Sequence, residues 1–174
     1  VHIDTSLLRA LSGDQLQRTQ VEQIRQLLTL ENVVLAVGAG YSSDVAALAP
    51  ALDNTMLLSP SASAASLSNV SAFPTFGRLI MSDDQQSIAL ADIVRRGGWK
   101  KVGVVRCDDL YCSGLTQGTL EQLSGLGITD VEMLGTIHEQ GGAQTRRASI
   151  ELSIDTVRQW LQNCAEWPED SAAV

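Results

Sequence analysis

The sequence has few basic residues and no long apolar run. These absences argue against a nucleic-acid-binding protein and against a membrane-spanning segment. Its 174 residues include 12 Lys and Arg against 20 Asp and Glu, a formal net charge of −8. Nucleic-acid binding draws on clustered Lys and Arg. The pairs Arg95-Arg96 and Arg146-Arg147 are isolated, so we expect no nucleic-acid partner. No apolar run approaches the roughly 18 residues of a membrane-spanning helix, so we expect this segment not to cross a membrane.

Cysteine is also scarce. Cys107, Cys112 and Cys164 form no metal-ligand spacing and cannot all pair with one another. Cys107 and Cys112 are close enough in the chain for a local disulfide, and unpaired structural thiols are the alternative that the sequence leaves open. We predict neither a metal site nor a cofactor.

Enzyme motifs are missing as well. The sequence has no P-loop lysine motif and no Gly-x-Ser-x-Gly elbow, and His2 and His138 lie in no metal or triad pattern. Gly38-x-Gly40-x-x-Ser43 resembles half of a dinucleotide fingerprint, but its third glycine is absent and no acidic residue ends the next strand. We therefore predict that the chain is not an enzyme, with a soluble α/β nucleotide-binding enzyme domain as the alternative.

The chain begins without Met and without a charged-then-apolar signal segment, and residues 1–5 already resemble a strand. Such a start is typical of a processed protein or an excised fragment. Asn69-Val70-Ser71 is an N-glycosylation sequon within a small, polar stretch. Asn69 is therefore a candidate glycosylation site, and it points weakly to the secretory route.

What the sequence does contain is an alternation of strand and helix signals. Residues 33–37 form an unbroken apolar run, which is typical of a strand covered on both faces. The expected strands are 1–5, 33–37, 55–58, 76–81, 102–105 and 131–137, and the expected helices are about 12–30, 42–52, 82–96, 113–126 and 150–161. This alternation predicts an α/β fold with parallel sheets and helices on both faces.

Two of these helices carry further signals. Residues 42–44 are expected to supply N-cap oxygens to the helix they open, and Pro50 is expected to kink or shorten it. In the helix that starts near Ser82, the residues expected to face inward are Ile88, Ala91, Ile93 and Val94.

Hydroxyl side chains gather at the ends of the expected strands: Ser42, Ser43, Ser61, Ser63 and Tyr111. Ligands of open parallel sheets bind beyond the carboxyl ends of the strands. Two serine turns and a helix N-terminus would suit an anionic group such as a carboxylate. The alternative is that these residues are helix caps and turn residues, which serine also favours.

Taken together, these segments resemble the receptor-family ligand-binding region, which has the type I periplasmic-binding fold. Members of this family include class C G-protein-coupled receptors, bacterial branched-chain amino-acid-binding proteins and natriuretic-peptide-type guanylate cyclases. The shared markers are the Gly turn before Ser42-Ser43, the Leu-Ser-Pro-Ser-Ala-Ser run at 58–63, Phe76 with Arg78, Ser82-Asp83, and Gly-Trp-Lys-Lys-Val at 98–102. They lie in the right order within about residues 1–140.

The resemblance implies two Rossmann-like lobes with parallel sheets, joined by a hinge and closing on a ligand. The first lobe would comprise residues 1–81 and the second residues 82–174, with the crossing near 79–84. Further family strands would precede Val1 and follow Val174, so the resemblance implies that this chain is an incomplete fragment of the fold.

The resemblance also implies a site. Residues that hold the carboxylate and amine of an amino acid in the family match Ser42 or Ser43, then Ser61, Ala62 and Ser63. The family's hinge Asp matches Asp83, and its ligand-contacting Tyr matches Tyr111. Ser63 stands where the family has Thr, Pro60 where it has an aromatic residue, and Tyr41 adds bulk, and these differences bear on which amino acid is bound.

By the same resemblance, the chain would be the extracellular sensor region of a membrane receptor. It would bind a small ligand such as an amino acid, on the outer face of the plasma membrane or in the periplasm of a bacterium. The full-length protein would be membrane-anchored and dimeric. A truncated family member without a ligand is the further alternative.

Overall fold

The structure is a computed structural model, and it describes residues 14–30, 32–52, 54–139 and 142–165. The chain divides into two compact units, Val1–Ser82 (unit one) and Asp83–Val174 (unit two), and each is described by itself. The strand expected at residues 1–5 lies outside the described residues.

Unit one contains a three-stranded parallel sheet in the order β1-β2-β3. Its elements are α1 (Asp14–Leu30), β1 (Leu35–Val37), α2 (Ser42–Leu48), the 3₁₀ turn η2 (Ala49–Ala51), β2 (Met56–Ser59), the 3₁₀ turn η3 (Ala65–Ser68) and β3 (Phe76–Arg78). Helix α1 ends at Leu30, as predicted. The prediction for Pro50 is also confirmed, because the α-helix stops at Leu48 and Pro50 lies in the 3₁₀ turn that follows.

The buried side chains of unit one include Leu57 of the sheet and, from the helical segments, Leu28, Val45, Ala49 and Leu52. On β1 and its neighbour β2, Leu35 is 47% exposed, Val37 69% and Met56 47%. The expectation that the strand at 33–37 is covered on both faces is therefore wrong. An apolar run shows that a strand is hydrophobic, but it does not show whether a second layer of secondary structure covers that strand.

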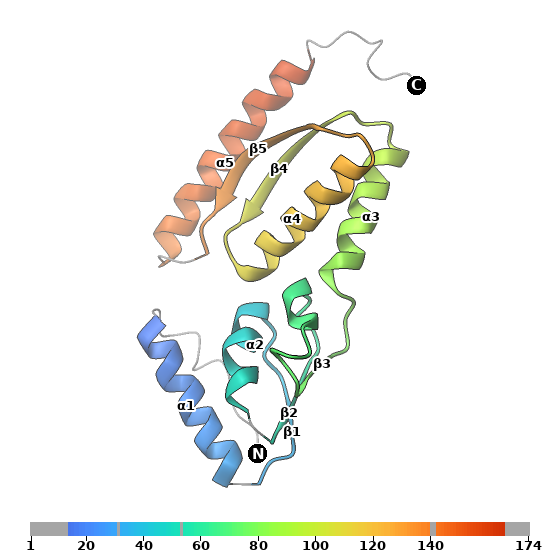
Figure 1. Cartoon of the computed structure of the whole chain (residues 1–174). Helices are drawn as coiled ribbons and strands as arrows, with labels where there is room; N and C mark the ends of the chain where they lie inside the picture. Colours follow the sequence, from blue (N-terminus) through green and yellow to red (C-terminus); the bar gives the residue numbers. More distant parts are fainter. Residues whose placement is uncertain (1–13, 31, 53, 140–141, 166–174) are drawn as a thin grey trace. The chain divides into compact units, whose positions relative to one another are not determined.

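Unit two contains a pair of parallel strands with helices on both sides (Figure 1). Its elements are α3 (Asp83–Arg96), β4 (Lys101–Cys107), α4 (Leu110–Gly125), β5 (Asp130–Ile137) and α5 (Gly142–Ala165). Gly98 and Gly127 have positive φ angles, 69° and 77°, and follow the ends of α3 and α4, where the sequence predicted the helices to stop. The predicted α/β fold with parallel sheets is confirmed in both units.

The face of α3 that is buried matches the prediction at Ala91 but not at Ile88 or Ile93. Ile88 and Ile93 are 48% and 56% exposed, whereas Asp83, Ser87 and Ala91 are buried. These three residues lie four apart and so share one face of the helix. A Cβ on Gly118 of α4 would lie 2.6 Å from the Ser87 hydroxyl oxygen. The helices α3 and α4 therefore approach too closely for large side chains, and small residues occupy the contact.

Helix α5 packs on the strands through a similar close contact. A Cβ on Gly135 of β5 would lie 3.2 Å from the Cα of Ser153 and 2.8 Å from its Cβ. Further along α5, the ring of Trp160 lies under the ammonium group of Lys101, 5.9 Å from its nitrogen. Although α5 has 24 residues, no helix within the described part of the chain combines the length and apolarity required to cross a membrane.

We expect Gly135→Ala to lower the free energy of unfolding by about 1–3 kcal/mol, because the added methyl group meets the backbone of α5. Gly114→Ala in α4 is the matched control. No atom lies within 4 Å of its added Cβ, so it should raise stability by roughly 0.5–1 kcal/mol. Urea unfolding followed by circular dichroism measures both, and a Gly135→Ala protein as stable as the unsubstituted chain would contradict the packing described.

Candidate functional site

The turns that follow β1 and β2 are joined by the buried side chain of Ser59. Its hydroxyl donates a hydrogen bond to the Ala39 carbonyl (2.7 Å) and accepts one from the Ala62 N–H (3.0 Å). A second bond runs alongside, from the Ser61 hydroxyl to the Gly40 carbonyl (2.8 Å). Parallel strands end at the same edge of a sheet, and these bonds fix the two turns against each other there.

Backbone conformation in the first turn explains its glycines. Gly38 has a φ of 149° and Ala39 a φ of 55°, and both values lie in the region that side-chain-bearing residues rarely adopt. At Gly40 a Cβ would lie 3.3 Å from the Ser61 hydroxyl oxygen. The turn favours glycine at position 38 for its backbone conformation, and a Cβ at position 40 would require the Ser61 hydroxyl to move by a few tenths of an ångström. Neither feature involves a dinucleotide.

Ser42 does not cap α2, contrary to the expectation for residues 42–44. The N-cap residue is Tyr41, whose own side chain makes no capping hydrogen bond. The buried Ser42 hydroxyl instead accepts a hydrogen bond from the Ala64 N–H (3.1 Å), beyond the second serine turn. For Ser42 the capping prediction is wrong, because the N–H group of a residue distant in sequence uses this oxygen.

The predicted site residues of unit one divide into buried and exposed groups. Ser42, Ala62 and Ser63 are buried, with exposed fractions of 4%, 0% and 3%. Ser43 and Ser61 are exposed. Contact of these five residues with a ligand remains a prediction, and the hydroxyls of Ser43 and Ser61 are the ones exposed to solvent.

Arg78, at the end of β3, holds the second serine turn, the one that follows β2, in place through hydrogen bonds. Its guanidinium donates to the carbonyls of Ser63 (2.9 Å) and Ala64 (3.0 Å) and to the Ser68 hydroxyl. The sequence analysis used Arg78 only as a family marker. Its role could not be read from the sequence, because the carbonyls it binds lie 14 and 15 residues away.

In unit two, Asp83 and Tyr111 come close enough to interact electrostatically. Burial raises the pKa of the Tyr111 phenol above its usual range, and the carboxylates of Asp83 and Asp109 raise it further. The Tyr111 hydroxyl therefore stays protonated and can donate a hydrogen bond. Asp83 is buried at the first turn of α3 and accepts a hydrogen bond from the Gln86 side chain (2.9 Å).

Helix α4 begins at Leu110, three residues earlier than predicted, which places Tyr111 and Cys112 in its first turn. Asp109 is the N-cap, and its carboxylate accepts a hydrogen bond from the Cys112 N–H (2.7 Å). Cys107, the last residue of β4, forms a disulfide with Cys112. Of the two alternatives left open by the sequence, the structure has the disulfide, and Cys164 is free.

A histidine–aspartate pair lies beside this turn. His138 Nδ1 is 2.8 Å from a carboxylate oxygen of Asp108, and the Glu139 N–H donates to the other oxygen (3.0 Å). The Glu139 N–H and then the His138 side chain lower the pKa of Asp108. The pair ties the loop after β4 to the end of β5, and the sequence analysis, which treated His138 alone, did not anticipate it.

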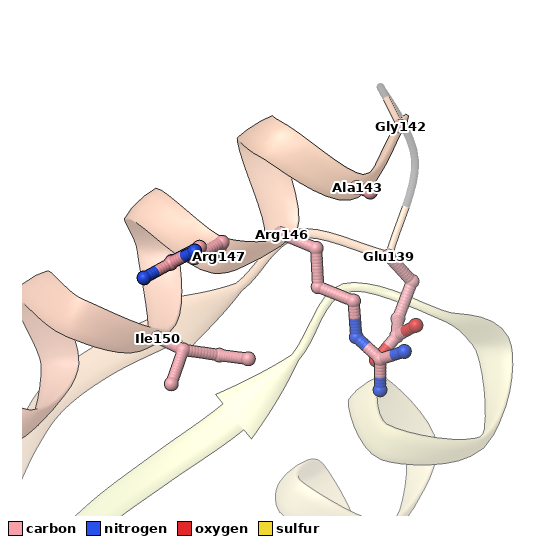
Figure 2. Close-up of a pocket in the computed structure, with 6 residues that line it drawn as sticks. All are labelled: Glu139, Gly142, Ala143, Arg146, Arg147 and Ile150. Atoms are coloured by element: carbon pink, nitrogen blue, oxygen red, sulfur yellow. The ribbon is translucent and has the colours of Figure 1, made fainter.

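A hollow of about 440 Å³ lies against the first turns of α5 (Figure 2). Glu139, Gly142, Ala143, Arg146, Arg147 and Ile150 line it. Figure 2 shows Arg146 pointing toward Glu139, and the two groups form an ion pair at 3.2 Å. Arg147 pairs with Glu151 at 2.9 Å. Both cations are matched by carboxylates, and none of the predicted site residues lines this hollow.

Asn69 is exposed and follows the 3₁₀ turn η3. Its side-chain oxygen accepts hydrogen bonds from the N–H groups of Ser71 (3.1 Å) and Ala72 (3.3 Å). The sequon is therefore folded as a surface turn.

Residues 12–158 match the family described as the receptor family ligand binding region. The chain is 39% identical over 79 residues to the extracellular calcium-sensing receptor of Homo sapiens. It is 36% identical over 81 residues to taste receptor type 1 member 3 of Canis lupus familiaris, and 30% identical over 84 residues to G-protein coupled receptor family C group 6 member A of Homo sapiens. These matches cover 45%, 45% and 47% of this chain, but only 7%, 10% and 9% of the respective receptors.

The two neighbouring serines of the first turn should differ in their effect on stability. Ser42→Ala leaves the buried Ala64 N–H without its acceptor, which should cost about 1–3 kcal/mol. Ser43→Ala alters an exposed side chain, and should change stability by less than about 0.5 kcal/mol. Denaturant unfolding of the two variants checks this, and equal stabilities would show that the Ser42 bond contributes little.

Proposed function

Because this chain belongs to the receptor family ligand-binding region, as its match over residues 12–158 shows, we propose that it binds a small ligand carrying both a carboxylate and an ammonium group, such as an amino acid. The receptor relatives support action by binding and not by catalysis. The observation on which the proposal depends most is the pairing of two strand-end turns, each of which presents an exposed hydroxyl, Ser43 or Ser61.

The serine turns of unit one are proposed to bind the carboxylate. Hydroxyl groups donate short, strong hydrogen bonds to ionised acceptors. The bonds from Ser59 and Arg78 hold both turns before any ligand arrives, which reduces the entropy lost on binding. Helix α2 has only seven residues, so the hydroxyls and not a helix dipole are assigned the main role. Ser61 must release the Gly40 carbonyl to donate, and its net contribution should be the smaller.

Asp83 and Tyr111 of unit two are proposed to bind the ammonium group. A carboxylate attracts an ammonium ion directly, and the face of a tyrosine ring attracts it through the ring quadrupole. Both groups already interact with each other electrostatically. The buried contact between α3 and α4 holds their helices together.

The wider setting is also a proposal. Units one and two would correspond to parts of the two lobes of the family fold. The region would lie outside the cell as part of a membrane-anchored, dimeric receptor, which the relative named an extracellular receptor supports.

Calorimetric titration with a panel of amino acids tests the proposed function. Hydrogen bonds to charged groups contribute about 1.5–3 kcal/mol, so Ser43→Ala should weaken binding roughly 10–150-fold. Ser61→Ala should fall near the lower end of that range, and Tyr111→Phe should alter affinity least, since it keeps the ring. Ser124→Ala, an exposed serine on α4, is the control and should bind as the unsubstituted chain does.

Three results would count against this proposal. They are an affinity unchanged in both serine variants, an equal loss in the Ser124→Ala control, and saturable binding of NAD(P) or ATP, which would favour the enzyme alternative. Because one relative is named for calcium sensing, the same titration is repeated with CaCl₂.

We also propose that Asn69 carries a glycan in the eukaryotic secretory pathway, since its sequon is exposed. Secreted protein should lose mass on glycosidase treatment. Asn69→Gln and Ser71→Ala should each abolish that loss, because each removes a required part of the sequon. An unmodified Asn69 in secreted material would defeat this assignment.

A further inference from the structure

Three metal-ligating side chains meet where β4 passes into α4. The sulfur atoms of Cys107 and Cys112 and a carboxylate oxygen of Asp109 all lie within 4.8 Å of one another. All three residues are partly exposed, so a dissolved ion can reach them. The cysteines alone suggested no metal site in the sequence, because the third group is a carboxylate from the same turn.

We propose that reduction of the Cys107–Cys112 disulfide turns this cluster into a binding site for a zinc-class divalent cation. Two thiolates and one carboxylate are three of the four ligands of a tetrahedral zinc site, and water supplies the fourth. Thiolates select zinc over calcium or magnesium, which take oxygen ligands.

The distances suit such a site once the sulfur atoms are no longer bonded. With Zn–S near 2.3 Å and Zn–O near 2.0–2.2 Å, ligand atoms of a tetrahedral site are about 3.5–3.8 Å apart. The Cys107 sulfur already lies 3.8 Å from the Asp109 oxygen Oδ1. The Cα atoms of the two cysteines are 5.3 Å apart, and side-chain rotation is enough to separate the sulfur atoms. A carboxylate offers about four lone-pair sites, so Asp109 can bind the ion and still accept from the Cys112 N–H.

The conversion balances in two steps. A dithiol reductant gives two electrons and two protons to the disulfide, becomes a cyclic disulfide itself, and leaves two thiols at Cys107 and Cys112. The divalent ion then displaces the two thiol protons into solvent and binds both thiolates and the Asp109 carboxylate. The metal keeps its oxidation state throughout. This inference does not rest on the proposed amino-acid site.

Titration of the reduced chain with Co²⁺, and displacement of Co²⁺ by Zn²⁺, tests the site. Thiolate coordination should give a near-ultraviolet charge-transfer band that saturates at one Co²⁺ per chain, and the oxidised chain should give none. Cys107→Ser and Cys112→Ser should each abolish the band. Asp109→Asn keeps an N-cap residue, yet should weaken Co²⁺ binding by more than about 10-fold, since even outer-shell partners of metal ligands contribute that much.

Cys164→Ser is the matched control, because Cys164 is the free cysteine among the described residues, and it should bind Co²⁺ as the unsubstituted chain does. Circular dichroism follows the fold of each variant. The proposal is overturned if the reduced chain gives no thiolate band, if the band survives either Cys107→Ser or Cys112→Ser, if Cys164→Ser abolishes it, or if reduction unfolds the chain and Zn²⁺ does not restore it.

Discussion

Ser59 is fully buried at the end of β2, and its hydroxyl reaches the turn that follows β1. A buried hydroxyl without partners would cost free energy, and this one donates to one turn and accepts from the other. The exposed groups near Ser59 cannot move independently of each other, because these two bonds fix the turns that carry them. Ser61 and Gly40 face each other because Ser59 has already set the separation of their turns. The positions of the exposed residues of the candidate site in unit one are therefore set by a buried side chain.

In unit two, small residues at helix contacts determine where the candidate site residues lie. Gly118 allows α4 to approach Ser87 of α3, and Asp83 lies on the same face of α3 as Ser87. The contact between Ser87 of α3 and Gly118 of α4 thus also determines where the Asp83 carboxylate lies relative to Tyr111. At the other side of the strands, Gly135 and Ser153 make a still closer contact.

Local signals in the sequence predicted the order and type of the elements, and non-local contacts set the rest. Some bounds were wrong, since β3 ends at Arg78 and α5 begins at Gly142, eight residues before the predicted start. Pro50, Gly98 and Gly127 act through their own backbone, so the helix ends near them could be predicted. The burial of Ala91 on α3 was predicted, but that of Asp83 and Ser87 could not be, because apolar periodicity at Ile88 and Ile93 says nothing about the glycine on the facing helix. The candidate site divides in the same way. The strand-end serines were visible in the sequence, whereas the partners of Ser42 and Arg78 lie far along the chain.

The small, polar contacts of unit two also affect how its stability depends on temperature. Its buried side chains include Asp83, Ser87, Ala91, Leu123, Leu134, Ser149 and Ser153. Exposure of apolar surface raises the heat capacity of the unfolded chain, and exposure of polar surface lowers it. A unit whose helices meet through serines gains less heat capacity on unfolding than one with an aliphatic core of equal size. Its free energy of unfolding should therefore follow a flatter curve between cold and heat.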